Sequence, residues 1–179
     1  MTRAAADLPA QLNSSCPARR TGERFPTELL QYECFMADPE TIYNWRRLDD
    51  RITTSGQPTE SQLAEIHALG VRHIVNLGLH TSVKAMPDEA ASVGRLGMTY
   101  IHIPVDFQNP TERDFEQFCS VMQRLNDVPI HVHCIANYRV SAFCYRYRRD
   151  VPAMDETQAR SDMEDIWHPE GVWAAFVDR

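Results

Sequence analysis

The chain has 179 residues, 43% of them hydrophobic and 24% charged, a composition typical of a soluble globular protein with room for one ordinary domain. Its formal charge of −7 argues against a nucleic-acid partner, because binding to a phosphate backbone needs a basic surface. No apolar run approaches the length of a bilayer span and the first residues lack the apolar core of a signal peptide, so no membrane partner is expected. Five cysteines without a CxxC pair favour a reducing compartment, and the cytoplasm is the expected location.

The N-terminal part of the chain, residues 1–40, is predicted to be an extension that is partly mobile or helical, followed by a single domain over 41–179. Ala, Pro, Ser and Arg mix there without apolar periodicity up to about residue 25. Asp38-Pro39 resembles an N-cap followed by proline at the first helical position, which predicts a helix through Trp45.

Strands and helices alternate in the rest of the chain. Apolar runs bounded by turn residues predict strands at 52–54, 71–77, 99–105 and 129–133. Helical periodicity and capping residues predict helices at 59–69, 87–96, 111–125, 140–149, 155–167 and 170–178. This alternation predicts an α/β fold with a mostly parallel sheet of four to five strands flanked by helices. Ligands in such sheets bind beyond the carboxyl ends of the strands.

One segment places a thiol between a strand and a helix. The strand over 129–133 ends at His133, Cys134 follows, and a helix is expected from Val140. A helix N-terminus carries unpaired N–H groups and partial positive charge, so a thiol there should be acidified and an oxyanion could lie over it. Arg139 would add a planar, permanently charged fork for a tetrahedral anion. The pattern therefore indicates attack on phosphorus or sulfur.

The order His133, Cys134, arginine, serine resembles the signature of cysteine-dependent protein tyrosine and dual-specificity phosphatases. Three further blocks are similar to the bacterial dual-specificity-like branch, which includes phosphatase-like domains fused to beta-lactamase-like hydrolases. These blocks are Thr54-Ser-Gly-Gln-Pro-Thr59, Gly70-Val-Arg-His-Ile-Val-Asn-Leu77 and Ile103-Pro-Val-Asp106. The likeness covers roughly residues 45 to 150, so it implies a dual-specificity-phosphatase-like domain.

The resemblance implies hydrolysis of phosphate monoesters, either protein phosphotyrosine or another phosphoester, through a cysteinyl-phosphate on Cys134 and without a cofactor. It implies that Asp106 is the general acid, that the Ser141 hydroxyl assists departure of the thiolate, and that His133 supports the cysteine environment. Backbone N–H groups would surround the phosphate at Ile135, Ala136, Asn137, Tyr138, Arg139 and Val140.

Two features depart from the family's pattern. Arg139 follows the cysteine by five residues rather than six, a Cys-x4-Arg loop, and Val140 occupies the family's arginine position. The loop also lacks the usual glycines, which permit positive φ. Rhodanese-like sulfurtransferases have a loop of this shorter length, and a phosphatase scaffold that binds phosphate without turnover is a third alternative. Both alternatives stay open at this point.

Several polar residues outside the loop have ordinary explanations. Cys119 and Cys144 fall on apolar helix faces and are predicted to lie in the core. Asp114 is expected to complete the cap of Thr111 rather than to act as an acid. The strand histidines 131 and 133 have no third ligand at motif spacing, so no metal is predicted. The arginines 146, 148 and 149 are expected on a solvated face.

Overall fold

The computed structural model describes residues 37–151 and 155–179. The predicted extension over 1–40 therefore lies almost entirely outside the described residues, and its boundary at residue 41 stays a prediction. Within the two described ranges, no helix is long and apolar enough to cross a bilayer.

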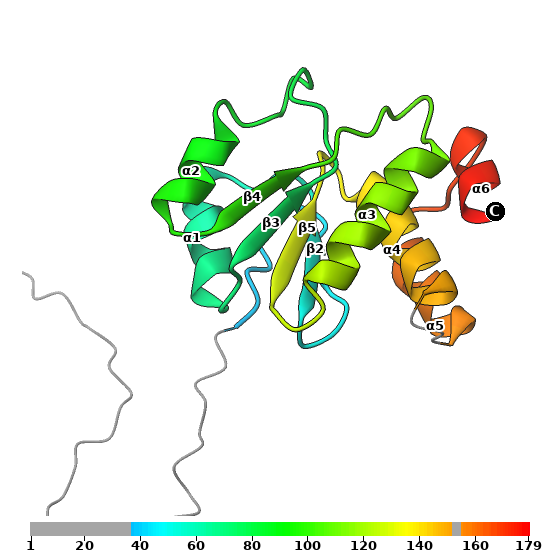
Figure 1. Ribbon diagram of the computed structural model, residues 1–179, viewed down its shortest axis with the longest axis horizontal. Helices are drawn as coiled ribbons and strands as arrows, with labels where there is room; N and C mark the ends of the chain where they lie inside the picture. Colours follow the sequence, from blue (N-terminus) through cyan, green and yellow to red (C-terminus); the bar gives the residue numbers. More distant parts are fainter. Residues whose placement is uncertain (1–36, 152–154) are drawn as a thin grey trace, which may run out of the picture. The chain divides into compact units, whose positions relative to one another are not determined.

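Five strands form one sheet in the spatial order β1-β2-β5-β3-β4. From β1 to β5 their bounds are Arg46–Arg47, Ile52–Ser55, His73–Asn76, Thr99–His102 and Ile130–His133. β1 runs antiparallel to β2, and the other neighbouring pairs are parallel, which confirms the predicted mostly parallel sheet (Figure 1). β5 lies in the middle and all its residues are buried, because helices cover both faces of the sheet.

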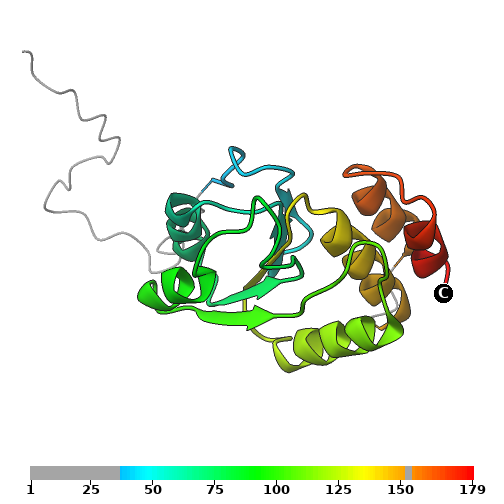
Figure 2. The ribbon, with the colours of Figure 1, turned by 90° about the horizontal axis from the view of Figure 1, so that it is seen from above.

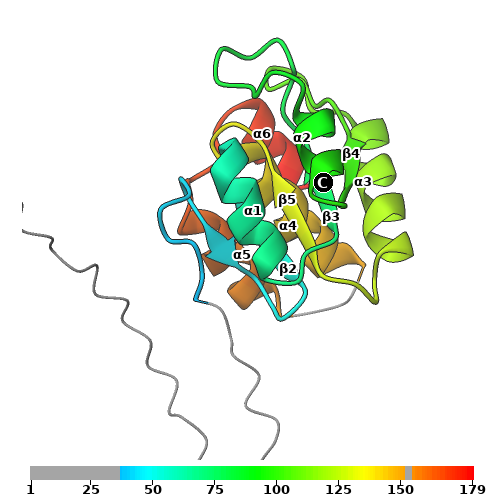
Figure 3. The same cartoon turned by 90° about the vertical axis from the view of Figure 1, so that its left-hand side faces the viewer.

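In the described ranges the helices are α1 (Glu60–Ala68), α2 (Glu89–Arg95), α3 (Glu112–Arg124), α4 (Tyr138–Asp150), α5 (Glu156–Glu164) and α6 (Val172–Val177). α1 and α2 cover one face of the sheet, whereas α3, α4 and α6 cover the other (Figure 2). Viewed from the α1 side, α4 lies behind the sheet (Figure 3). α5 packs against α4, so α4 is enclosed by the sheet on one side and by helices on the other.

The strands contribute side chains to two separate hydrophobic cores, one on each face of the sheet, because successive side chains of a strand point to opposite faces. In β3, Ile74 belongs to the core that includes Leu63 of α1. Its neighbour Val75 belongs to the other core, together with Phe118 of α3 and Phe143 of α4. The sheet is therefore held from both sides, and the positions of its strand ends are fixed by packing.

Local capping signals in the sequence are confirmed. Thr59 and Thr111 are the N-caps of α1 and α3, and each forms a capping box. The partner of Thr111 is Asp114, whose carboxylate accepts from the Thr111 N–H at 3.0 Å, as predicted. Gly70, with φ of 91°, follows the end of α1 in the left-handed conformation that glycine adopts without strain.

The predicted helix over 38–45 is wrong. The segment forms turns and then enters β1, with Asn44 in the left-handed region at φ 51°. Its backbone is held by the neighbouring turn instead, since Gly56 N–H donates to Tyr43 O at 2.7 Å. A further difference is the start of α4, which begins at Tyr138 rather than Val140. Arg139 therefore lies in the first turn of a helix and not in a loop.

Most of α4 is buried, and this overturns one prediction. Arg146 and Arg148 do not lie on a solvated face, because only 3% and 6% of their surfaces are exposed. Arg146 bonds Glu112 at 2.6 Å, and Arg148 pairs with Asp162 of α5. Cys144 is buried in the same helix as predicted, and burial raises the pKa of its thiol to about 12.

Candidate active site

The ends of three parallel strands lie level with one another around Cys134. His133, the last residue of β5, is in register with Ser55 of β2 and Asn76 of β3. Cys134 follows directly, is fully buried, and donates its N–H to Ser55 O at 3.4 Å. The cysteine therefore lies at the carboxyl edge of the sheet, where ligands of parallel sheets bind.

The loop after Cys134 has its carbonyl groups fixed from outside. Ile135 O accepts from the Gln57 N–H at 3.2 Å, and Ala136 O accepts from Asn44 Nδ2 at 3.0 Å. All described peptide bonds are trans, and a trans peptide points its C=O and its following N–H in opposite directions. The N–H groups of Ala136 and Asn137 are therefore turned away from these partners.

Asn137 takes the place of the missing loop glycine. Its φ of 66° and ψ of 0° lie in the left-handed region, which asparagine tolerates better than most residues. The side chain is held by two bonds from Nδ2, to Asn44 O at 2.7 Å and to Thr54 Oγ1 at 3.0 Å. The loop lacks the usual glycines, and an asparagine adopts the positive φ in their place.

The N-terminus of α4 has no side-chain cap. Asn137 is the N-cap residue, but its amide donates elsewhere and its oxygen has no partner among the described residues. The first backbone bond of the helix runs from the Ser141 N–H to Asn137 O at 2.9 Å. Within the described ranges, the N–H groups of Tyr138, Arg139 and Val140 therefore have no acceptor, and they lie at the positive end of the helix dipole.

Arg139 is a buried cation without a carboxylate partner. Only 7% of its surface is exposed, and no ion pair involves it within the described part of the chain. Its Nε is buried without a hydrogen-bond partner there, and its Cζ lies 5.2 Å from the centroid of the Phe107 ring. An unpaired buried charge is costly, and a bound anion would offset that cost.

Asp106, the predicted general acid, lies in the turn after β4. Its side chain is exposed, and Oδ1 accepts from the Gln108 N–H at 2.9 Å. The neighbouring residue, Phe107, contacts Arg139 and accepts a bond from Trp173 Nε1 at its carbonyl oxygen at 2.8 Å. The turn that carries Asp106 therefore adjoins the first turn of α4, and the catalytic role of Asp106 stays a prediction.

Ser141 is held by a residue that sequence reasoning missed. Its hydroxyl donates to Tyr138 O at 3.0 Å and accepts from Trp167 Nε1 at 3.0 Å. Trp167 also stacks on the Tyr138 ring, with centroids 4.8 Å apart. The hydroxyl must turn away from Tyr138 O to assist a thiolate. Trp167 lies outside the sequence blocks that resemble the family, so nothing in the sequence predicted its contact with Ser141.

His133 faces a buried carboxylate that the sequence also gave no reason to single out. His133 Nε2 lies 3.0 Å from Glu89 Oε1, and both side chains are almost completely buried. Burial alone would raise the pKa of Glu89. The bonds and positive charge from His133, with further bonds from Gln57 and Tyr100, outweigh burial and lower it. The carboxylate is therefore ionised.

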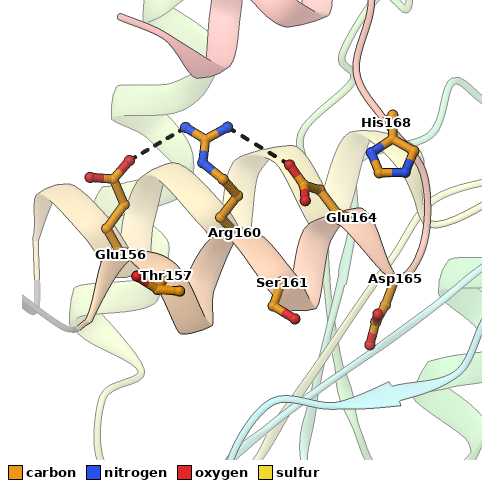
Figure 4. Close-up of a pocket in the computed structure, with 7 residues that line it drawn as sticks. All are labelled: Glu156, Thr157, Arg160, Ser161, Glu164, Asp165 and His168. Atoms are coloured by element: carbon orange, nitrogen blue, oxygen red, sulfur yellow. Dashed lines mark hydrogen bonds and ion pairs between the residues drawn. The ribbon is translucent and has the colours of Figure 1, made fainter.

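Two hollows differ in their relation to the loop. One, of about 340 Å³, adjoins Ile135 and is walled by Tyr43, Gln57 and Met86 among others. The larger, of about 540 Å³, runs along α5 and includes no residue of the cysteine loop. Arg160, the arginine in that larger hollow, pairs with glutamates on both sides (Figure 4). The charge of Arg160 is therefore already neutralised, whereas the first hollow adjoins the cysteine loop through Ile135.

The described residues hold no group of three or more His, Cys, Asp or Glu side chains placed to bind a metal ion.

Comparison with known proteins gives a consistent result. Residues 40–172 match the family PTP-NADK, described as "DSP-PTPase phosphatase fused to NAD+ Kinase". A beta-lactamase hydrolase-like protein of Agrobacterium fabrum is 28% identical over 128 residues, which are 70% of this chain and 28% of that protein. This chain thus spans little more than a quarter of that relative.

Solved structures show the same fold. A candidate phosphatase (DUF442) from Shewanella putrefaciens CN-32 is 34% identical, with a TM-score of 0.69 over 76% of this chain and 87% of the other. P. aeruginosa TpbA, as a variant in complex with pTyr, is 20% identical, with a TM-score of 0.62 over 79% of this chain and 86% of the other. The predicted resemblance to dual-specificity-like phosphatases is confirmed.

Proposed function

The chain belongs to the PTP-NADK family of DSP-PTPase phosphatases, and on this premise we propose that it hydrolyses phosphate monoesters through a cysteinyl-phosphate on Cys134. One observation carries the proposal. Arg139 is buried without a carboxylate partner among the described residues, beside an uncapped helix N-terminus. A dianionic phosphoryl group would pair with both features at once.

The free N–H groups of the loop and of the first turn of α4 would bind the oxygens of the phosphoryl group. Arg139 would donate from its guanidinium to two of these oxygens, since a planar fork matches a tetrahedral oxyanion. The donors are fixed before substrate binds, because the loop carbonyls and the Asn137 side chain are held from outside. Preorganised donors stabilise the charge of the transition state without rearrangement.

In the first step the Cys134 thiolate would attack phosphorus. An S–P bond forms, the ester P–O bond breaks, and Asp106 gives its proton to the departing oxygen. In the second step water attacks phosphorus and gives a proton to the Asp106 carboxylate. The S–P bond then breaks, inorganic phosphate leaves, and the thiolate returns. The Ser141 hydroxyl would donate to that thiolate after turning from Tyr138 O.

The substrate we propose is an aryl phosphate such as phosphotyrosine. The hollow beside Ile135 offers the exposed ring of Tyr43 and the apolar side chain of Met86 to an aromatic leaving group. Binding of pTyr by TpbA supports this choice by analogy of fold alone.

The proposal is tested by trapping the intermediate. The protein is mixed with p-nitrophenyl phosphate, quenched in acid within milliseconds and digested, and mass spectrometry locates the phosphoryl group. A phosphorylated peptide carrying Cys134 is expected, together with steady release of p-nitrophenol. No release from any aryl or alkyl phosphate would overturn hydrolysis, and phosphate on another residue would overturn the role of Cys134.

Sulfur transfer is the competing activity, favoured by the four-residue spacing between Cys134 and Arg139. A thiosulfate–cyanide assay separates the two: thiocyanate above the rate of a Cys134→Ser control would favour the sulfurtransferase. Phosphate binding with neither activity would indicate a scaffold that binds without turnover.

A further inference from the structure

We propose that the hollow beside Ile135 is a substrate-binding subsite in which Lys84 pairs with a carboxylate, so that the preferred substrate is an aryl phosphate that also carries a carboxylate group. The inference rests on the proposed function for the chemistry at Cys134, and it names the substrate class of that same site. Lys84 is the single lysine of the chain and lies exposed in the loop between β3 and α2. This loop rises beyond the carboxyl end of β3 (Figure 1).

The hollow is joined to the cysteine loop by fixed contacts. Its volume is about 340 Å³, and Ile135, the residue after Cys134, is part of its wall. Gln57, on the same wall, donates its N–H to Ile135 O at 3.2 Å and its Nε2 to Glu89 Oε1 at 2.9 Å. A substrate group that extends from the proposed phosphate site past Ile135 therefore enters a hollow whose wall is already in place.

Tyr43 contributes an aromatic ring that is exposed and yet held in position. The residue is 57% exposed. Its carbonyl oxygen accepts from the Gly56 N–H at 2.7 Å, and a Cβ added at Gly56 would lie only 2.9 Å from Tyr43 Cδ1. The ring therefore rests on a glycine, where a larger residue would displace it. Because the ring is already ordered, packing an aromatic group on it costs little side-chain entropy.

The charges around the hollow leave one cation without a partner. Glu60 and Lys84 are its two charged wall residues. The Glu60 carboxylate pairs with Arg95 and accepts from Ser92 Oγ at 3.0 Å, and the Arg95 bond, followed by the Ser92 bond, lowers the pKa of Glu60. Lys84 takes part in no ion pair within the described ranges. The hollow therefore favours an anionic group, although the formal charge of the chain is −7.

Together these features match the groups of an acidic aryl phosphate. The phosphoryl group would lie at Arg139 and the free N–H groups of α4. The aromatic ring would pack against Tyr43 and Met86, and the carboxylate would pair with Lys84. A lysine is a compact charge on a flexible stem, so it can reach a carboxylate that extends past the ring. Exposed ion pairs contribute little, so we expect a preference of about threefold and not an absolute requirement.

The first test compares 3-(4-phosphonooxyphenyl)propionate with its carboxamide, which has the same shape and lacks the charge. Their phenol leaving groups have similar acidity, so the ratio of the two kcat/KM values reports binding at the hollow. We expect a ratio of about three in the wild type, about one in Lys84→Gln and less in Lys84→Glu. Arg160→Gln is the matched control, because it removes one positive charge from the other hollow and should keep the ratio. Equal values in the wild type, or a ratio that Lys84→Gln does not lower, would overturn the proposal.

A second test observes Lys84 without turnover. Reductive methylation with ¹³C-formaldehyde labels Lys84 as the only side-chain amine and keeps its charge. The protein is then titrated with the non-hydrolysable difluoromethylphosphonate analogues of the two substrates. We expect the carboxylate analogue to shift the Lys84 methyl signal and to bind about threefold more tightly than the carboxamide analogue. A Lys84 signal that neither analogue moves at saturation would overturn the proposal.

Phosphotyrosyl peptides identify the source of the carboxylate. If a peptide with aspartate beside the phosphotyrosine is preferred over its asparagine counterpart, the carboxylate can come from a polypeptide. If only the small pair shows the preference, the substrate is a small acidic aryl phosphate. Both results support the subsite, and they differ in the ligand that they assign to it.

The two proposals fail separately. If the wild type hydrolyses no phosphoester but its Lys84 signal responds to the carboxylate analogue, the proposed function is wrong and the subsite stands. If the wild type turns over both small substrates equally well, the subsite is wrong and the proposed function stands.

Discussion

Both ends of α4 carry buried arginines, but the arginines at one end have carboxylate partners and the arginine at the other end does not. Towards the C-terminal end, Arg146 bonds Glu112 at 2.6 Å and lies 3.9 Å over the Phe115 ring, while Arg148 pairs with Asp162. In the first turn, Arg139 is also buried, at 7% exposed, but it has no ion pair among the described residues, and the Phe107 ring lies 5.2 Å from its Cζ. The paired arginines hold helices together, whereas the unpaired Arg139 is the arginine that we propose binds an anion.

The nearby cysteines and histidines can also be divided into residues of the core and residues of the proposed site. Cys144 is enclosed within α4, whereas Cys134 lies between a strand and the free N–H groups of the helix start. His131 is bonded on both sides, to Thr53 Oγ1 and Ser55 Oγ at 3.0 Å each, and is structural. Depth of burial therefore does not mark the site. What distinguishes the proposed site is a buried guanidinium, that of Arg139, which has no carboxylate partner among the described residues.

The largest expected effect comes from exchanging sulfur for oxygen at the two buried cysteines. Cys134→Ser should lower kcat on p-nitrophenyl phosphate by about 10⁴-fold or more, because the nucleophile is lost. Cys144→Ser should keep kcat within about twofold and lower the free energy of unfolding by about 1–3 kcal/mol, since it buries a hydroxyl. Steady-state kinetics and urea unfolding measure both. If the Cys134→Ser protein were still active, Cys134 would not be the nucleophile, and its thiol would not differ in function from that of Cys144.

The arginines should separate activity from stability. Arg139→Met should lower kcat/KM by about 10²–10³-fold, as loss of a preorganised oxyanion donor does, and leave the free energy of unfolding unchanged or higher. Arg146→Met should keep kcat/KM and lose about 1–2 kcal/mol of stability through its lost aromatic and carboxylate contacts. A large stability loss in Arg139→Met would show that Arg139 belongs with the paired arginines.

Asp106 and Asp114 offer a smaller contrast. Asp106→Asn should slow hydrolysis of phenyl phosphate by about 10²-fold and that of p-nitrophenyl phosphate much less, because an acidic leaving group needs little protonation. Asp114→Asn should weaken the α3 cap by about 0.5–1 kcal/mol and affect both substrates equally. Equal slowing of both substrates by Asp106→Asn would exclude it as the general acid.

The local part of this arrangement could be predicted from the sequence. Capping boxes, strand ends and the cysteine loop depend on neighbouring residues, and the boxes at Thr59 and Thr111 formed as expected. The helix over 38–45 did not, because a contact across the fold, from Gly56 N–H to Tyr43 O, holds that backbone in turns. Local propensity is outweighed where distant segments supply the hydrogen bonds.

The non-local part could not be predicted. An exposed helix face and one covered by α5 look alike in sequence, so Arg148 was expected in solvent. The partner of His133 is Glu89, 44 residues away by their numbers, and nothing local distinguishes it from other acidic residues in first turns. Whether a buried side chain such as Arg139 finds a carboxylate partner depends on the folded chain and cannot be read from its neighbours in sequence.

Stability should fall as the pH drops below the ordinary pKa of histidine, 6.5, because burial holds the pKa of His131 well below that value in the fold. The unfolded chain then binds a proton that the folded chain does not, so stability is full above pH 6.5 and lost on acidification. The slope should approach about 1.4 kcal/mol per pH unit. Urea unfolding from pH 7 to pH 5 measures it. His131→Gln should remove most of this slope, and an unchanged slope would assign it elsewhere.

The smallest expected effect concerns Asn137, the residue that adopts a positive φ in a loop without glycine. Asn137→Ala should cost about 1–2 kcal/mol more than Asn137→Gly, because alanine is strained at φ 66° while both variants lose the same two side-chain bonds. Unfolding in urea gives the difference. The glycine variant should also keep more activity, since its backbone can still turn its N–H groups inward. If alanine and glycine behave alike in both measurements, the left-handed turn at Asn137 is not what shapes the anion site.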